Sequence, residues 1–226
     1  MNNFFNADNP FFVVMGKAWD VFVVNMIWLL CCLPVVTIVP ATTAMYYTMV
    51  KVIRRERGYV TREFFRSFKR NLKQGLGFSA IAIALVVVFY FDFVYSIALM
   101  AEEKSTGNTF LGVFLVMAFL AVALYMYIPP VLSRFDMKFG GIFKTSFFMA
   151  TRHFLTTIVL LILFVAVLVG CLAIAPGIFF LPATGVLLST FLIERVFKKY
   201  MPAKKETVEE ETEEGQEAET DEWYLE

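Results

Sequence analysis

The sequence predicts an all-α polytopic transmembrane helical bundle, with about six crossings arranged as three hairpins and with amphipathic interfacial elbow helices. Composition is the first observation, because 59% of the 226 residues are hydrophobic and the mean hydropathy is +0.68, outside the usual range of soluble domains. The second is a set of uncharged stretches, each of about 17 residues or more and so long enough to cross a bilayer. These stretches are residues 21–50, 75–91, 105–133 and 154–193.

The third observation is the distribution of charge along the chain. Residues 206–226 contain eleven acidic residues and no basic residue, so residues 1–205 carry a net formal charge of +11. Eighteen of the basic residues fall in three regions, residues 51–73, 134–152 and 195–205. The positive-inside rule predicts that these regions are cytoplasmic and that the loop 101–108 is outside. We therefore expect a multi-pass membrane protein with both termini in the cytoplasm.

A repeated phrase marks the turns of the first and third hairpins, since residues 34–42 read PVVTIVPAT and residues 176–184 read PGIFFLPAT. Proline lacks an amide hydrogen and disfavours helix in the residue before it, so two prolines six positions apart end one helix and start the next. Ala and Thr permit close helix contact, and a Thr hydroxyl can satisfy a backbone group freed by the turn. We expect each turn to be the outer hinge of a hairpin. The predicted hinge residues are Pro34, Pro40, Ala41, Thr42, Pro176, Pro182, Ala183 and Thr184.

The helical arm that follows each hinge is short. Each has about 10 to 16 apolar residues, against the roughly 20 that a spanning helix needs. A full crossing requires Lys51, Arg54 or Arg195 to extend its side chain to the lipid headgroups. A re-entrant pair of half-helices is the other arrangement, and the sequence leaves both open.

Amphipathic segments precede the crossings and define the units of the fold. Residues 61–75 place Phe64, Phe65, Phe68 and Leu72 on one helix face and basic residues largely on the other, the pattern of a helix lying in the membrane interface. Residues 140–154 and 9–20 are weaker copies. The predicted organisation is a transmembrane domain, 1–205, with hairpin units 9–57, 61–133 and 140–199, followed by a disordered acidic cytoplasmic tail, 206–226.

The residues around the first hinge carry a family resemblance. The stretch VPATTAMYYTMVKVIRRERGY, followed by FFRSFKRNLKQG and further membrane helices, resembles the YesL-like family of bacterial integral membrane proteins, a domain of unknown function. The resemblance covers about residues 4–200. Family members are often encoded beside carbohydrate-uptake ABC transporters and polysaccharide-degrading enzymes of Gram-positive bacteria. This implies an accessory role in sugar uptake or its sensing, with an ABC-type sugar transporter as a partner; the acidic segment from Glu206 departs from the usual family ending.

The sequence contains few residues of the kinds that catalyse reactions or bind metals. His153 is the only histidine, which excludes a zinc site with two histidines and an HExxH motif. Cys31, Cys32 and Cys171 lie within apolar runs without metal-ligand or redox spacing, as is typical of small buried side chains. No P-loop, GxSxG or dinucleotide-binding motif occurs. We expect no enzymatic activity, cofactor or metal, and a membrane enzyme using Asp92 or His153 is a less favoured hypothesis.

Asp92 is an acidic residue inside a predicted crossing, in the stretch VVVFYFDFVYSIALM. An acid there costs roughly 2.5 to 3.5 kcal/mol on insertion scales, so it is expected to face an interior cavity or to lie near the headgroups. One hypothesis is a polar site in the pathway of an independent small-solute carrier or exporter. The other is an acid near the interface, bonded to Tyr95 or to a neighbouring helix.

The basic region after the first hairpin has two interpretations. It can set the topology while contacting anionic lipid headgroups, at about 1 kcal/mol per basic residue near the surface, or it can dock a cytoplasmic protein. Nucleic acid is disfavoured because the aromatic residues here lie on the apolar face. The predicted docking residues are Arg54, Arg55, Arg57, Arg62, Arg66, Lys69, Arg70 and Lys73.

The acidic tail is of low complexity, which predicts disorder. Solvated disorder alone is one interpretation. Intramolecular contact with the basic loops is a second, and docking of Trp223, Tyr224 and Leu225 in a groove of a partner is a third.

Overall fold

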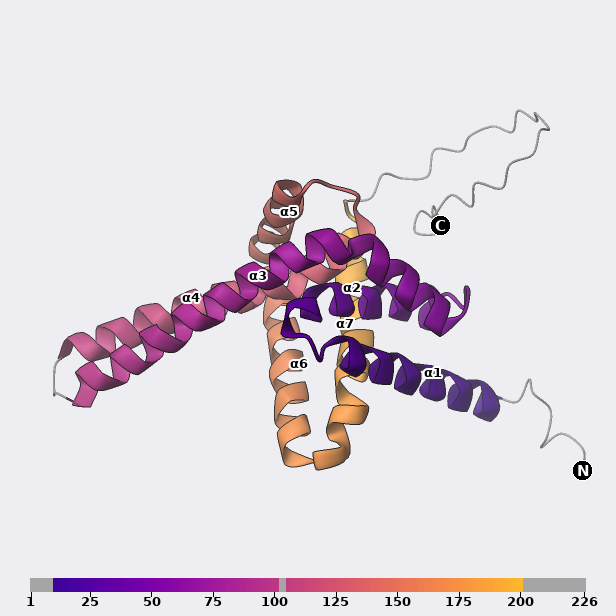
Figure 1. Cartoon of the computed structure of the whole chain (residues 1–226), viewed down its shortest axis with the longest axis horizontal. Coiled ribbons are helices and arrows are strands. Elements are labelled where there is room, and N and C mark those ends of the chain that lie inside the picture. Colours follow the sequence, from indigo (N-terminus) through magenta and orange to yellow (C-terminus); the bar gives the residue numbers. More distant parts are fainter. Residues whose placement is uncertain (1–9, 102–104, 201–226) are drawn as a thin grey trace, which may run out of the picture.

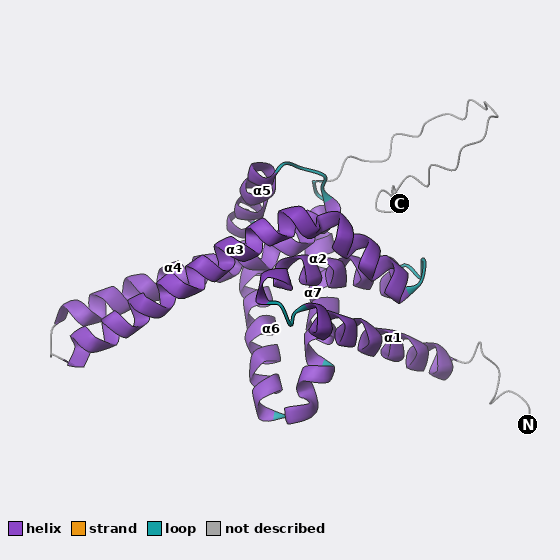
Figure 2. Ribbon diagram, viewed as in Figure 1, coloured by secondary structure: helices purple, strands orange, loops and turns teal. Residues whose placement is uncertain are grey.

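The structure is a computed structural model that describes residues 10–101 and 105–200. In these two ranges the chain forms helices joined by short connections, with no strand (Figure 2). The α-helices are α1 (Pro10–Cys31), α2 (Ile38–Thr48), α3 (Val60–Ala101), α4 (Ser105–Arg134), α5 (Phe139–Arg152), α6 (Phe154–Ala173) and α7 (Leu181–Phe197). Two 3-10 turns, η1 (Val35–Thr37) and η3 (Ala175–Phe179), and a π-helical turn, η2 (Met49–Arg54), complete the series. The predicted all-α class is confirmed, while the predicted tail at 206–226 lies outside the described residues.

Five helical segments of the described chain are long and apolar enough to cross a membrane. They are Phe12–Cys31, Val35–Arg54, Val60–Met100, Gly107–Arg134 and Phe154–Ala173. The sixth predicted crossing corresponds to α7, which has 17 residues. By helical rise α7 is about 26 Å long, slightly less than a hydrocarbon core of about 30 Å. The sixth crossing therefore stays a prediction, and a re-entrant α7 is its alternative.

The helices leave a common core in different directions (Figure 1). The outer halves of α3 and α4 form one hairpin, and α6 and α7 form a second that points another way. One apolar cluster joins α2, the end of α4, α5 and the end of α7. A second cluster joins α1, α2, the start of α3 and the start of α7. Helices α2, α3 and α7 each contribute to both clusters. The segment Val35–Arg54, which contains α2, is 78% buried, against 17% or less for the other four candidate spans, so α2 is the centre of the fold.

Much apolar surface outside the core is exposed within the described chain. Val86 on α3 is 67% exposed, Val113 on α4 is 60% exposed and Leu172 on α6 is 88% exposed. Burying a side chain of this size is worth about 1.5 to 3 kcal/mol, so a row of them is costly in water. Lipid acyl chains are the environment that suits such helices.

The turn between α1 and α2 lies beside the middle of α3. The Val39 N–H donates a hydrogen bond of 3.2 Å to Ser79 Oγ, and Pro40 packs directly on Gly75. Helix α3 continues from Ser79 to Ala101, which is about 33 Å by helical rise. The sequence predicts that this turn and the loop 101–108 both lie at the outer face. If α3 crosses upright, the two cannot both lie there. The outer position of each turn stays a prediction, and an upright α3 places the two turns at different levels.

The elbow helices also differ from the prediction. Helix α3 runs without a break for 42 residues, so residues 61–75 continue into the crossing instead of forming a separate elbow. Residues 9–20 likewise belong to the continuous α1 as far as it is described, from Pro10. Only α5 is a separate amphipathic helix, because the backbone leaves the helical region at His153, with φ −107° and ψ 50°. A helix continues wherever no proline or unfavourable dihedral stops it, and glycines alone do not stop it.

Candidate functional site

At both hinges a side chain of another helix accepts a hydrogen bond from a backbone amide at the start of a helix. A helix start leaves amide donors without intrahelical partners. At the first hinge Ser79 of α3 accepts from the Val39 N–H at 3.2 Å. At the second hinge Asn25 of α1 accepts from the Ala183 N–H at 3.1 Å and donates to the Ile178 carbonyl at 2.9 Å. A polar side chain from another helix therefore fixes each turn in place.

The eight predicted hinge residues lie at these two turns. Pro34 precedes η1 and Pro40 is in the first turn of α2, whereas Pro176 is in η3 and Pro182 is in the first turn of α7. Ala41 and Ala183 are fully buried. The Thr42 hydroxyl donates to the Ile38 carbonyl at 2.7 Å and the Thr184 hydroxyl donates to the Phe180 carbonyl at 2.9 Å. The threonines thus bond to carbonyls of their own helix start.

A buried ion pair joins the ends of α4 and α7. Arg134 donates two hydrogen bonds to the Glu194 carboxylate, one of them from Nε to Oε1 at 3.0 Å. The Tyr46 hydroxyl of α2 donates to the same Oε1 at 3.0 Å. Arg134 and Glu194 are 5% and 6% exposed. Because three helices meet at one carboxylate, this contact fixes their relative positions. The charge pattern assigned Arg134 only to a cytoplasmic basic region, so this contact was not predicted.

A second ion pair joins η2 to the start of α3. Lys51 Nζ lies 3.0 Å from Glu63 Oε2 and donates to the Tyr47 hydroxyl at 3.3 Å. Both charged side chains are buried. Glu63 therefore acts inside the core and does not neutralise the surface of α3.

The eight predicted docking residues divide into two groups. Three of them contact groups of the fold: Arg54 donates to the Thr190 carbonyl at 3.1 Å, Arg55 is partly buried near Arg134, and Arg70, although exposed, lies over the Tyr47 ring. Burial, followed by the nearby Arg134 charge, lowers the pKa of Arg55. The other group lies at the surface or half-buried, and it comprises Arg57, Arg62, Arg66, Lys69 and Lys73.

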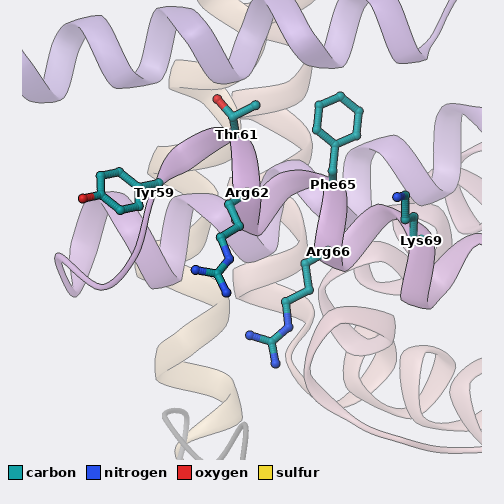
Figure 3. Close-up of a pocket in the computed structure, with 6 residues that line it drawn as sticks. All are labelled: Tyr59, Thr61, Arg62, Phe65, Arg66 and Lys69. Carbon is teal, nitrogen blue, oxygen red and sulfur yellow. The ribbon is translucent and has the colours of Figure 1, made fainter. Parts of the chain in front are cut away.

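An open groove of about 660 Å³ runs along this second group. Its lining comes from one face of the first turns of α3 and from the residue before them, and consists of Tyr59, Thr61, Arg62, Phe65, Arg66 and Lys69 (Figure 3). Arg62 and Arg66 point to the same side, and Phe65 points to the other (Figure 3). The lining contains cationic and aromatic groups and no carboxylate. We call this feature the basic groove; cationic and aromatic side chains together suit an anionic ligand at a membrane interface.

A second groove, of about 420 Å³, lies where the described chain ends. It is lined by Phe135, Met137, Lys144, Thr145, Phe148, Met149 and Tyr200. The Tyr200 hydroxyl and His153 Nε2 are 3.0 Å apart. Partial burial, then Lys199 and Arg152, lower the pKa of His153. The imidazole lies beside an aromatic residue, and these contacts include neither a second histidine nor a carboxylate.

Asp92 lies on the exposed surface of α3, and neither groove includes it. Its backbone carbonyl accepts from Ser96 Oγ at 2.7 Å. The proposed partner Tyr95 is itself 57% exposed. The described residues contain no cluster of three or more His, Cys, Asp or Glu side chains suited to a metal ion, and the three cysteines are free.

Comparison with known proteins agrees with the motif at the first hinge. Residues 21–93 match a family model described as a protein of unknown function, DUF624. The chain is also similar to an uncharacterised protein, YesL, of Bacillus subtilis (strain 168), with 29% identity over 180 residues, 78% of this chain and 82% of that protein. These two matches support the resemblance of the chain to the YesL-like family. No solved structure matches it.

The part of the chain that matches the DUF624 family model contains the basic groove. Residues 21–93 run from the middle of α1 through the first hinge and α2 to the outer half of α3. The contacts of Pro40 with Gly75 and of Val39 with Ser79 lie inside this range. The second hinge and Glu194 lie outside it. The match to the DUF624 family model therefore covers the groove and the turn that packs beside α3.

Proposed function

We propose that this integral membrane protein is a non-enzymatic accessory or regulatory component of carbohydrate uptake, and that the basic groove is its docking surface. The observation that carries the proposal is that some charged residues form buried pairs whereas others line an open groove. Buried charges such as Arg134 and Glu194 are held in pairs, whereas Arg62 and Lys69 line an open groove. Paired charges stabilise a fold, while cations in an open groove are available for recognition.

The link to carbohydrate uptake in this proposal comes from the family resemblance. An ABC-type sugar transporter is the protein partner that the resemblance implies, and such a partner would hydrolyse ATP itself. Anionic headgroups of the bilayer are the second partner that suits the groove, because Tyr59 and Phe65 offer aromatic surface beside the basic residues and aromatic residues favour the membrane interface.

An independent small-solute carrier or exporter is the alternative. A carrier needs polar groups along an interior pathway. Asp92 was its best candidate, and this side chain is exposed on the outer half of α3, outside both grooves. The geometry thus favours docking over a pathway through Asp92.

Affinity purification from membranes tests the proposal. We expect transporter subunits to be recovered in fixed ratio with the parent chain and to be lost from the triple variant Arg62→Gln, Arg66→Gln, Lys69→Gln. The matched control is Arg195→Gln, Lys198→Gln, Lys199→Gln, which removes three exposed bases elsewhere and should retain the partner. Recovery of the protein alone, with solute flux in liposomes that Asp92→Asn abolishes, would establish the carrier instead.

We also propose the cell membrane location with both termini in the cytoplasm. Labelling by an impermeant thiol reagent in intact cells tests this with single cysteines at Ser105 and at Thr207. Ser105→Cys should react and Thr207→Cys should not. Val36→Cys, in the exposed first turn, should also fail to react, because α3 extends about 33 Å beyond that level. Reaction of Thr207→Cys would refute the orientation.

A further inference from the structure

The surface around the basic groove has a large excess of positive charge. Residues 51–73 contain nine bases and two acids, Glu56 and Glu63. Glu63 is buried and held by Lys51 at 3.0 Å. Glu56 is held by Lys17 at 2.5 Å, and this pairing lowers the pKa of the Glu56 carboxyl. Both acids of the segment are therefore already engaged away from the groove.

The groove itself presents its cations in an extended row. Arg62, Arg66 and Lys69 follow helical spacing along one side of α3. Arg62 and Arg66 extend in the same direction, whereas the Lys69 side chain is directed to the side of Phe65 (Figure 3). A row of cations along a helix suits an extended polyanion with several carboxylates better than a single small anion, because each base can meet a separate carboxylate.

We propose that the acidic segment 206–226 of the same chain docks in the basic groove. This segment carries eleven acids and no base, and the remainder of the chain carries a net charge of +11. The two parts thus neutralise each other completely. Tethering favours this occupant over free ligands, because a linked segment is present at an effective concentration in the millimolar range.

The distance from the end of the described chain to the groove is short enough. Arg54 bonds to Thr190, so the end of η2 lies against α7. From Thr190 to Tyr200 along α7 is about 15 Å, and from Arg54 to Tyr59 is at most about 18 Å. The groove therefore lies within about 40 Å of Tyr200, whereas the 16 residues from Met201 to Gln216 span about 53 Å when extended.

Docking of this segment would make the groove a regulated surface. Anionic lipid or a protein partner would have to displace the segment before it contacted Arg62 or Lys69. Since exposed charge pairs are screened by salt, the docked state should be favoured at low ionic strength and opened at high ionic strength.

Disulfide trapping in the full-length chain tests the inference. The native Cys31, Cys32 and Cys171 are replaced by alanine, and Gln216→Cys is combined with Thr61→Cys in the groove. The matched control combines Gln216→Cys with Thr151→Cys. Thr151 is exposed like Thr61, and it lies nearer the point where the tail begins, since its neighbour Arg152 lies over the Tyr200 ring at 6.0 Å.

A tail held in the groove should give more intramolecular disulfide at Thr61→Cys than at Thr151→Cys, on the order of tenfold in a zwitterionic detergent at low salt. The difference should vanish in about 1 M NaCl, where the Debye length is about 3 Å. It should also vanish in the background Arg62→Gln, Arg66→Gln, Lys69→Gln, and persist in the background Arg195→Gln, Lys198→Gln, Lys199→Gln.

Three outcomes would overturn the inference. Equal or greater trapping at Thr151→Cys would show a tail that moves randomly about its tether. Trapping between two molecules instead of within one would show that a second copy occupies the groove. Unchanged trapping in the groove variant, together with loss of bound phosphatidylglycerol by native mass spectrometry, would show that the groove binds lipid and not the tail.

Discussion

Glu194→Gln should destabilise the fold strongly, because it removes the negative charge to which Arg134 donates two hydrogen bonds in this buried contact. The Glu194 carboxylate accepts two hydrogen bonds from Arg134 and one from the Tyr46 hydroxyl. An amide retains the shape of the side chain and loses its negative charge. The Arg134 guanidinium, 5% exposed, then keeps its desolvation cost without the opposing charge.

Removing one partner of a buried ion pair typically costs about 3 to 5 kcal/mol. For a chain of this size, 1 kcal/mol corresponds to about 2 to 4 °C in melting temperature, so the expected loss is roughly 6 to 20 °C. Tyr46→Phe removes one hydrogen bond to a charged group and should cost less, about 1.5 to 3 kcal/mol. The double variant Arg134→Met, Glu194→Met should recover much of the loss, since well-packed apolar side chains often replace a buried pair at little cost.

The assay is thermal unfolding of the purified protein in detergent, followed by circular dichroism. Glu56→Gln is the matched control, because it makes the same substitution at an exposed glutamate paired with Lys17. That control should melt close to the parent. If Glu194→Gln also melts with the control, the reasoning that one carboxylate fixes α2, α4 and α7 is refuted.

Three further changes follow from particular contacts and use the same melting assay. Gly75→Ala places a Cβ 2.7 Å from Pro40 Cβ and should cost about 1 to 3 kcal/mol, whereas Gly112→Ala, with nothing within 4 Å, should stabilise by up to about 1 kcal/mol; equal melting of the two variants would contradict this packing. Asn25→Leu leaves an amide and a carbonyl of the second hinge without their partner and should cost about 1 to 3 kcal/mol for each, so an unchanged melting temperature would remove Asn25 from the hinge. His153 has a lowered pKa in the folded state, so its contribution is complete above the unfolded pKa of about 6.5 and is lost as pH falls below it; His153→Gln should therefore lose less stability than the parent between pH 7.5 and 5.5, and parallel curves would contradict the shift.

The class of fold and the positions of the two hinges follow from local sequence. Apolar runs longer than about 17 residues have few alternatives to membrane helices, and the two prolines of each hinge remove amide donors that a continuous helix would need. The described helices accordingly end and restart around residues 34–40 and 176–182. A pair of prolines does not always end a helix, because α4 continues through Pro129 and Pro130 to Arg134. Continuity of α3 was not predictable in the same way, because the change at Gly75 from basic to apolar residues alters the environment of the helix without interrupting its backbone hydrogen bonds.

The relative level of the turns depends on pairings between distant residues. Ser79 and Gly75 meet Val39 and Pro40 across some 35 to 40 positions of sequence. Serine and glycine are common in membrane helices, where small residues allow close approach. The sequence therefore does not indicate which residue either of them contacts. A charge-based topology assigns a side to each loop but no height to a turn, which is why two turns assigned to one face separate by half the length of α3.

In the basic segment, residues 51–73, the sequence likewise could not separate cations that stabilise the fold from cations that are available to bind a ligand. The sequence counts Arg54, Arg62 and Arg70 alike as cations of one amphipathic region. In the structure, Arg54 bonds to the backbone of α7 and Arg70 lies over Tyr47, whereas Arg62 lines the open groove. A cation that already donates to a buried carbonyl must break that bond to bind a ligand, and this cost separates structural from recognition residues more sharply than exposure does. Substituting Arg54 would consequently weaken the packing of η2 on α7 before it altered docking. The function of the groove is therefore tested by changes confined to Arg62, Arg66 and Lys69.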